Sequence, residues 1–125
     1  MTYLIIMSII LIHWFADFVL QTDKQAKGKS KNWTDLLDHT VNYSIVLSAL
    51  SMFLWPTGHT NAWYVAHSFY FAVITFIAHT ITDYFTSRLN SKLWAEGKVH
   101  QFFVSIGFDQ VLHYAQLFGT YYLLS

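Results

Sequence analysis

Residues 39–82 read HTVNYSIVLSALSMFLWPTGHTNAWYVAHSFYFAVITFIAHTIT, which is 44 consecutive positions without a Lys, Arg, Asp or Glu. The stretch is interrupted near its middle only by Pro56-Thr57-Gly58, a sequence typical of a turn. Each half has about 20 residues, the length that an α-helix needs to cross a hydrocarbon core of about 30 Å. The stretch therefore predicts a transmembrane helical hairpin.

Two further apolar segments flank this hairpin. Residues 2–21 contain Asp17 as their only charged residue, and residues 100–124 contain only Asp109. A carboxylate can lie within a bilayer when it faces protein rather than lipid. The sequence therefore predicts one all-α domain over residues 1–125. We expect a four-helix transmembrane bundle with spans at about 2–21, 36–55, 62–87 and 101–124.

The composition excludes several classes of protein. Only 11% of the 125 residues are charged and 54% are hydrophobic, whereas soluble domains average about 25% charged residues, so a soluble enzyme is not expected. The absence of cysteine excludes disulfides and thiolate metal sites. A net charge of zero argues against nucleic acid as a partner. No Lys or Arg precedes the first segment and Asp17 interrupts it, which argues against a cleaved signal peptide.

The basic residues predict the orientation. All seven Lys and Arg lie between the first and second segments or between the third and fourth; they are Lys24, Lys27, Lys29, Lys31, Arg88, Lys92 and Lys98. Basic loops of membrane proteins face the cytoplasm. Both loops are therefore expected inside and both termini outside. Membrane lipid is the expected partner, and the sequence leaves open a homo-oligomer.

Each predicted span carries one His/Asp pair at positions i and i+4. The pairs are His13 with Asp17, Asp35 with His39, His79 with Asp83, and Asp109 with His113. This spacing places both side chains on one face of a helix. At about 1.5 Å per residue from the nearest basic residue, His13, His39 and His79 come to a similar depth. We expect these faces to meet in one cavity.

Buried imidazoles and carboxylates together predict a metal site. Interhelical hydrogen bonds of about 0.6 kcal/mol each are the simpler alternative, but four pairs at similar depth favour a bound divalent ion or two. Zinc is expected first, and iron or manganese next. The candidate ligands are His13, Asp17, His39, His79, Asp83, Asp109 and His113. Gln21, Asp35, Asn42 and Gln110 are candidates for contacts that orient the ligands.

Three functions are compatible with such a site. The first is a metal-dependent hydrolase that acts on a lipid-linked phosphoester at the inner leaflet, with Asp17 and Asp83 as candidate general bases. The second is an ion or proton conduit. The polar groups are confined to the inner half of the spans, and this disfavours a conduit. The third is a non-catalytic membrane partner protein with a structural metal. The hydrolase is preferred.

The polar pattern resembles a known family. The matching residues are His13-Trp-Phe-Ala-Asp17-Phe-Val-Leu-Gln21-Thr-Asp, Ala26, Lys29-Ser30, Leu36-Leu37 to His39 with Tyr43, His79 to Asp83 with Ser87-Arg88, and Asp109-Gln110 to His113. This pattern is similar to that of the domain of unknown function 3307 family, which comprises small integral membrane proteins of bacteria and phages. The resemblance implies a multi-pass protein of the bacterial inner membrane and no particular activity. Asp35 lies outside the matching pattern.

Overall fold

Five α-helices and one short π-helix make up the chain in the computed structural model, which describes residues 1–125. They are α1 (Tyr3–Trp14), the π-helix η1 (Phe15–Val19), α2 (Asp23–Gly28), α3 (Trp33–Ser51), α4 (Asn61–Ala95) and α5 (Val99–Leu124). The all-α prediction is confirmed. By length and composition one helix, α4, is able to cross a membrane, and residues 3–19 form a shorter apolar helix. The four-span topology stays a prediction.

Local sequence determines where four of the helices begin. The side chains of Thr2, Thr22, Asn32 and Thr60 each accept a hydrogen bond from the backbone N–H three residues on. Such N-caps satisfy backbone donors that have no partner within the helix. The Asn32 cap starts α3 at Trp33, three residues before the span expected from hydropathy.

The longest helix also ends later than the expected span. α4 continues past Arg88 to Ala95, and Gly97, with φ of 68°, then allows the tight turn into α5. The charged residues after position 87 mark the end of the apolar segment but do not stop the helix, because Lys, Arg and Leu are all good helix formers. The expected span was therefore shorter than the helix that contains it.

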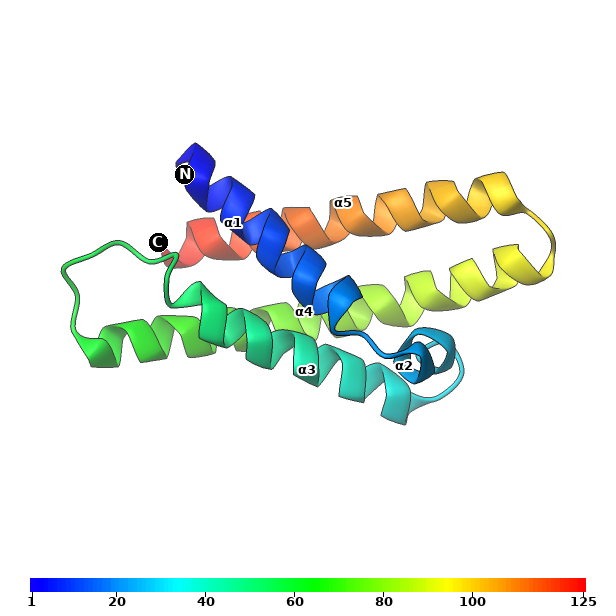
Figure 1. The fold of residues 1–125 in the computed structure, drawn as a ribbon, viewed down its shortest axis with the longest axis horizontal. Helices are drawn as coiled ribbons and strands as arrows, with labels where there is room; N and C mark the ends of the chain where they lie inside the picture. Colours follow the sequence, from blue (N-terminus) through cyan, green and yellow to red (C-terminus); the bar gives the residue numbers. More distant parts are fainter.

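The helices run antiparallel with both basic loops at the same end. Figure 1 shows α4 and α5 as a long hairpin, α3 beside α4, and α1 crossing α5 at an angle. The termini and the α3–α4 loop lie at one end of the molecule, whereas α2 and the α4–α5 turn lie toward the other. All seven Lys and Arg therefore occur toward that second end, in α2 and its loop or near the α4–α5 turn.

The end that holds the termini has a tightly packed apolar core. Trp55 stacks on Tyr121 with ring centroids 5.2 Å apart, and its Nε1 donates a hydrogen bond of 2.9 Å to Ser68 Oγ. The Tyr121 hydroxyl donates to the Leu54 carbonyl at 2.9 Å. The core residues are Ile9, Ala16, Tyr43, Leu47, Leu54, Trp55, Phe71, Leu117 and Tyr121. Most of the buried polar residues other than Ser and Thr lie between this core and the end of the molecule that carries the Lys and Arg residues.

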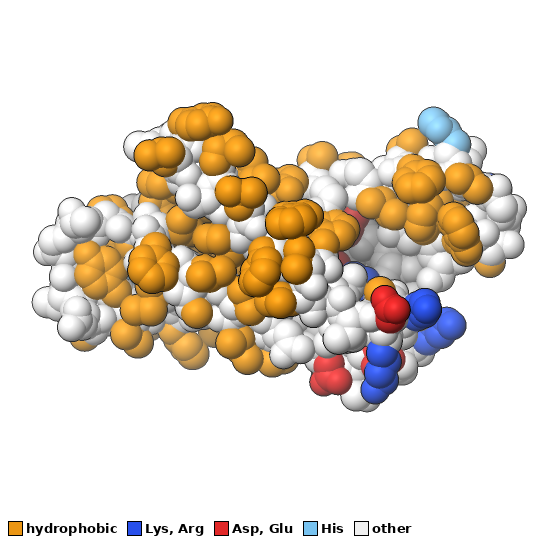
Figure 2. Space-filling view, viewed as in Figure 1, with side chains coloured by type: hydrophobic (Ala, Val, Ile, Leu, Met, Phe, Trp, Pro, Cys, Tyr) orange, Lys and Arg blue, Asp and Glu red, His pale blue; other side chains and the backbone are white.

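The surface is unusually apolar. Large hydrophobic side chains are exposed on each of the four long helical segments; examples are Leu4, Leu11, Ile45, Phe69, Ile77, Phe85, Phe103 and Val111. Figure 2 shows hydrophobic side chains spread over most of the visible face, with Lys, Arg, Asp and Glu gathered near one end. Continuous apolar surface on this scale is rare in soluble monomers and marks contact with lipid or protein.

Candidate metal centre

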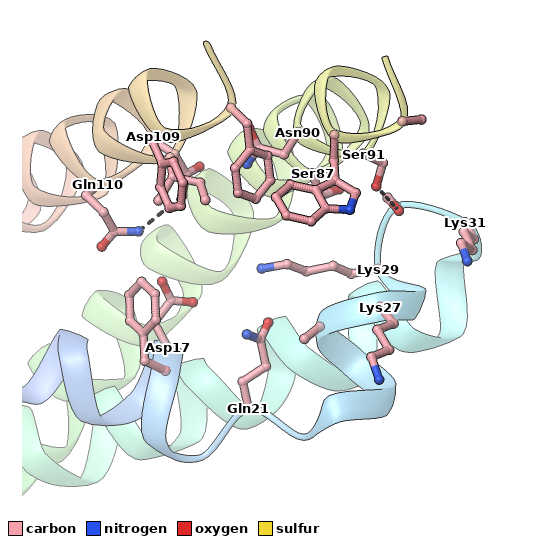
Figure 3. Close-up of a pocket in the computed structure, with 18 residues that line it drawn as sticks. Asp17, Gln21, Lys27, Lys29, Lys31, Ser87, Asn90, Ser91, Asp109 and Gln110 are labelled. Atoms are coloured by element: carbon pink, nitrogen blue, oxygen red, sulfur yellow. Dashed lines mark hydrogen bonds between the residues drawn. The ribbon is translucent and has the colours of Figure 1, made fainter. Parts of the chain in front are cut away.

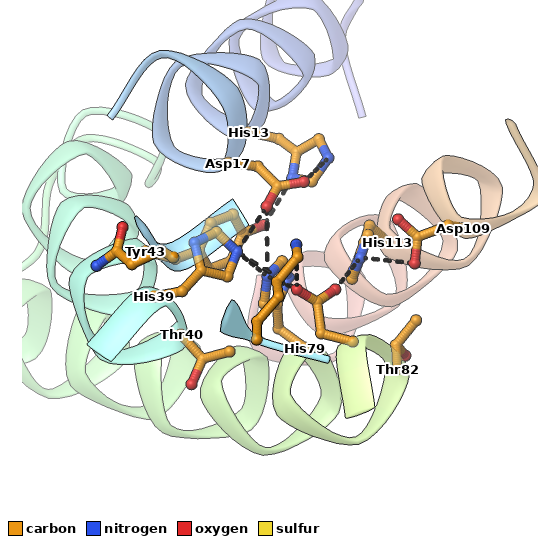
Figure 4. A network of polar contacts seen from close by, with 12 residues as sticks. His13, Asp17, His39, Thr40, Tyr43, His79, Thr82, Asp109 and His113 are labelled. Carbon is orange, nitrogen blue, oxygen red and sulfur yellow. Dashed lines mark hydrogen bonds and ion pairs between the residues drawn. The ribbon is translucent and has the colours of Figure 1, made fainter. Parts of the chain in front are cut away.

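Three helices and the π-helix bring imidazoles and carboxylates into one buried cluster. Figure 4 shows these side chains pointing toward one another between the helices. The cluster consists of Asp17 from η1, His39 from α3, His79 and Asp83 from α4, and Asp109 and His113 from α5. All are buried except Asp109, which is partly exposed. Two of the predicted pairs are thus present in full, His79 with Asp83 and Asp109 with His113, and each of the other two contributes one residue.

The first group of side chains that could hold a metal ion is formed by Asp17, His39, His79 and Asp83. One ligand atom of each lies within 4.8 Å of the others. Asp17 Oδ1 is 3.0 Å from His39 Nε2 and 3.4 Å from His79 Nε2. The two imidazole Nε2 atoms are 3.2 Å apart. Imidazole nitrogens and carboxylate oxygens that converge in this way suit a divalent transition metal.

A second group lies on the other side of Asp83 and consists of Asp83, Asp109 and His113. His113 Nε2 is 3.1 Å from Asp83 Oδ1 and 3.3 Å from Asp109 Oδ1. The other oxygen of Asp83, Oδ2, is 3.4 Å from His39 Nε2 and 3.5 Å from His79 Nε2. Asp83 therefore belongs to both groups, with one oxygen directed to each.

Lys29 enters the cluster from the end of α2. Its Nζ donates a 2.8 Å hydrogen bond to Asp83 Oδ2, and its side chain is only 19% exposed. Burial by itself lowers the pKa of Lys29, but the Asp83 and Asp17 carboxylates outweigh this effect and raise the pKa above its ordinary value. The ammonium is therefore charged at neutral pH. Sequence reasoning treated Lys29 as one of four loop lysines, and only its place in the family pattern set it apart.

His13 lies beside the two groups rather than within them. Its Nδ1 is 2.8 Å from the Tyr43 hydroxyl and its Nε2 is 2.9 Å from Gln110 Oε1. Since an amide oxygen only accepts, Nε2 donates and Nδ1 accepts from Tyr43. The Gln110 amide nitrogen donates in turn to Asp109 Oδ2 at 3.2 Å. His13 and Gln110 thus connect α1 to the carboxylate of Asp109, and His13 Nε2 is 3.6 Å from Asp17.

Asp17 lies in a turn that the sequence did not predict. Residues Phe15–Val19 form a π-helix, in which the Leu20 N–H donates to the Phe15 carbonyl at 3.0 Å. Ala16 and Asp17 face the protein interior, while Phe18 and Val19 are exposed. π-turns are rare and occur frequently at functional sites, because the extra residue changes the direction of a side chain.

Two of the candidate orienting residues lie away from the cluster. Asn42 is exposed on α3. The Asp35 carboxylate accepts a 2.8 Å hydrogen bond from Asn32 Nδ2 and is 3.5 Å from Lys24 Nζ, so it does not pair with His39. Asp35 also packs against Gly28, where any Cβ would collide with its carboxylate. Asp35 therefore joins α2 to the start of α3.

A cavity of about 760 Å³ lies next to the cluster (Figure 3). Asp17, Asp109 and Gln110 line it on the cluster side, and Lys27, Lys29 and Lys31 line it on the α2 side. Apolar side chains complete the wall; they are Phe18, Ala26, Trp94, Ala95, Phe102, Phe103 and Ile106. Besides Asp109 Oδ1, which lies 3.3 Å from His113 Nε2, three buried polar atoms along it have no hydrogen-bond partner, namely Gln21 Oε1, Ser87 Oγ and Asn90 Oδ1. Buried groups without a partner are uncommon and suit a polar ligand.

Comparison with known proteins identifies the family. No curated protein and no solved structure matches the chain. One family model, described as protein of unknown function (DUF3307), matches residues 5–124. The match includes every helix that contributes to the cluster and confirms the resemblance seen in the polar pattern. The chain therefore belongs to the DUF3307 family.

Proposed function

We propose that this protein is a membrane-embedded, metal-dependent hydrolase that acts on a lipid-linked phosphoester at the inner leaflet. One observation carries the proposal: two carboxylates of the buried cluster, Asp17 and Asp109, form part of the wall of a cavity whose remaining lining combines lysines, polar side chains and apolar, mainly aromatic, side chains. A metal-ligand set, a nearby carboxylate and a pocket for an anionic amphiphile are the parts that such a reaction requires.

The membrane location rests on the distribution of apolar and basic residues. We propose four spans, formed by α1 with η1, α3, α4 and α5, in the bacterial inner membrane. Exposed apolar side chains on all four segments support contact with lipid. At about 1.5 Å per residue, the 35 residues of α4 extend about 52 Å. A bilayer core of about 30 Å then leaves the end of α4 that carries Arg88 and Lys92 in the cytoplasm.

This topology predicts the location of fused reporters. Reporters at either terminus should be external, and reporters inserted at Lys29 or Asn90 should be internal, because all seven Lys and Arg lie toward the end of the molecule that these two sites represent. Paired fusions of a reporter active only outside and a reporter active only inside measure this directly. A cytoplasmic carboxyl terminus would contradict the proposed orientation.

The chemistry follows from the two groups of ligands. The residues of the two groups would hold zinc, or iron or manganese, and such an ion, when bound, would supply a water of lowered pKa and polarisation of a phosphoryl oxygen. Asp17 is the better candidate for the general base, because it lines the cavity and is within reach of an entering substrate. Asp83 does not line the cavity, and both its oxygens are engaged by Lys29 and the histidines. Lys29 offsets part of the negative charge of the carboxylates.

The cavity has the chemistry of a site for an anionic amphiphile. Lysine ammonium groups and the unpartnered Ser87 hydroxyl, which can donate a hydrogen bond, suit a phosphate-bearing head group. The rings of Phe18, Trp94 and Phe102 provide an apolar wall for the attached chain. A volume of about 760 Å³ lies within the range of roughly 300–1,000 Å³ for small-molecule sites.

The packing at the opposite end favours the hydrolase over the conduit. A conduit needs a polar path through the whole thickness of the membrane. The core around Tyr43, Leu47, Phe71, Leu117 and Tyr121 is buried and predominantly apolar, so it closes the path beyond the histidines. This arrangement supports access from the basic end only.

The test of the proposed function is turnover by the purified, metal-loaded protein in detergent or bilayer. We expect hydrolysis of lipid-linked phosphoesters, loss of hydrolysis after metal removal by a chelator, and recovery on adding the metal back. Soluble phosphoesters without an apolar chain should be poor substrates. If the metal-loaded protein hydrolyses none of these compounds, while liposomes containing it show metal-dependent ion flux, the proposed function would be an ion conduit instead of a hydrolase.

A further inference from the structure

We infer that the cluster binds two divalent metal ions and that Asp83 bridges them. The inference rests on the metal-binding part of the proposed function and is independent of whether the protein is a hydrolase. Its basis is the geometry of the two ligand groups, which have Asp83 as their one common member.

The two oxygens of Asp83 serve different groups of nitrogen ligands. Oδ2 is 3.4 Å from His39 Nε2 and 3.5 Å from His79 Nε2. Oδ1 is 3.1 Å from His113 Nε2 and belongs to the other group. A carboxylate that presents one oxygen to each of two sets of ligands is the usual bridge between two metal ions, which lie about 3.5–4 Å apart in dinuclear sites.

The number of ligands also exceeds what a single ion uses. Zinc takes four ligands, and catalytic zinc sites use three from the protein. The first group supplies four residues and the second supplies two more, which are Asp109 and His113. Since His113 is buried with its Nε2 directed at two carboxylates, it has the position of a ligand rather than of a residue packed at random.

The charges in the cluster accommodate a second ion and a substrate. Three carboxylates contribute −3 and Lys29 contributes +1. One divalent ion brings this sum to zero, and two bring it to +2. A phosphate dianion entering from the cavity restores neutrality. Uncompensated buried charge is costly, so the second ion creates a local requirement for an anion such as phosphate.

The experiment uses the intact protein loaded with Mn²⁺ in the presence of inorganic phosphate, measured by elemental analysis and by electron paramagnetic resonance. We expect two manganese ions per chain and the spectrum of an exchange-coupled pair. His113→Ala should bind one ion per chain and give the six-line spectrum of isolated Mn²⁺, because the second group then keeps only two carboxylates. His67→Ala, a matched change of a histidine that hydrogen-bonds to the Trp63 carbonyl, should keep the coupled pair.

The wild-type measurement decides the question even when a variant fails to fold. One ion per chain with an uncoupled spectrum would overturn the inference, and so would a coupled pair that survives in His113→Ala. Two coupled ions in a protein without hydrolytic activity would support the dinuclear site and contradict the proposed function. The two proposals therefore fail in different ways.

Discussion

Asp83→Ala is expected to lose the second metal ion, to bind the first more weakly and to lose hydrolytic activity, the largest effect of any single change in the cluster. Both ligand groups contain Asp83, so neither retains its full set of ligands. The change also leaves the buried Lys29 ammonium without its 2.8 Å partner, and breaking a buried ion pair costs about 3–5 kcal/mol of stability. Metal content, turnover and thermal unfolding of the purified variant measure these effects.

A matched control comes from the exposed surface of α3. Asp38 is exposed and lies next in sequence to His39. Asp38→Ala therefore removes a carboxylate from a residue adjacent to His39 without touching the cluster. This variant should keep wild-type metal content and turnover. An Asp83→Ala protein that retains two ions per chain would show that the shared carboxylate is not a ligand.

Asp17→Asn is expected to separate metal binding from catalysis. An amide oxygen can still coordinate a metal, but it cannot accept a proton at neutral pH. Turnover should therefore fall about 10²–10⁴-fold, which is the usual contribution of a general base, while the metal content stays near that of the wild type. Comparison of kcat with elemental analysis on the same preparation measures both quantities.

Asp109→Asn provides the comparison for this prediction. Asp109 also lines the cavity, but it belongs to the second group and accepts a hydrogen bond from Gln110. A ligand role alone predicts a smaller loss of turnover in this variant than in Asp17→Asn. Equal losses in the two variants, each with full metal content, would remove the reason for assigning the base to Asp17.

Most of the cluster could be anticipated because its members follow helical spacing. His79 and Asp83 are four residues apart on one continuous helix, as are Asp109 and His113, and in both pairs the two side chains reach the same cluster. The pattern failed at Asp35, which also stands four residues from a histidine. Asp35 occupies the third position of α3, where Asn32 caps the helix and engages both its backbone N–H and its carboxylate.

The features that the sequence did not predict depend on tertiary structure. Lys29 reaches Asp83 because it lies at the C-terminal end of α2, and apart from its place in the family pattern nothing in a loop with four lysines distinguishes the one that enters. The predicted ends of the spans differed from the observed helix ends for a related reason. Hydropathy reports where charges begin, as at Arg88, whereas helix ends depend on caps and turn residues such as Asn32 and Gly97.

The π-helix also determines how α1 is aimed. Because one residue of an α-helix corresponds to a rotation of about 100°, deleting either Phe15 or Ala16 would restore regular winding and rotate the whole of α1 relative to Asp17. His13 would then move away from Tyr43 and Gln110, while every residue of the two ligand groups stayed in the chain unchanged. A one-residue difference in length at this turn would thus alter which face of the first helix meets the site in this fold.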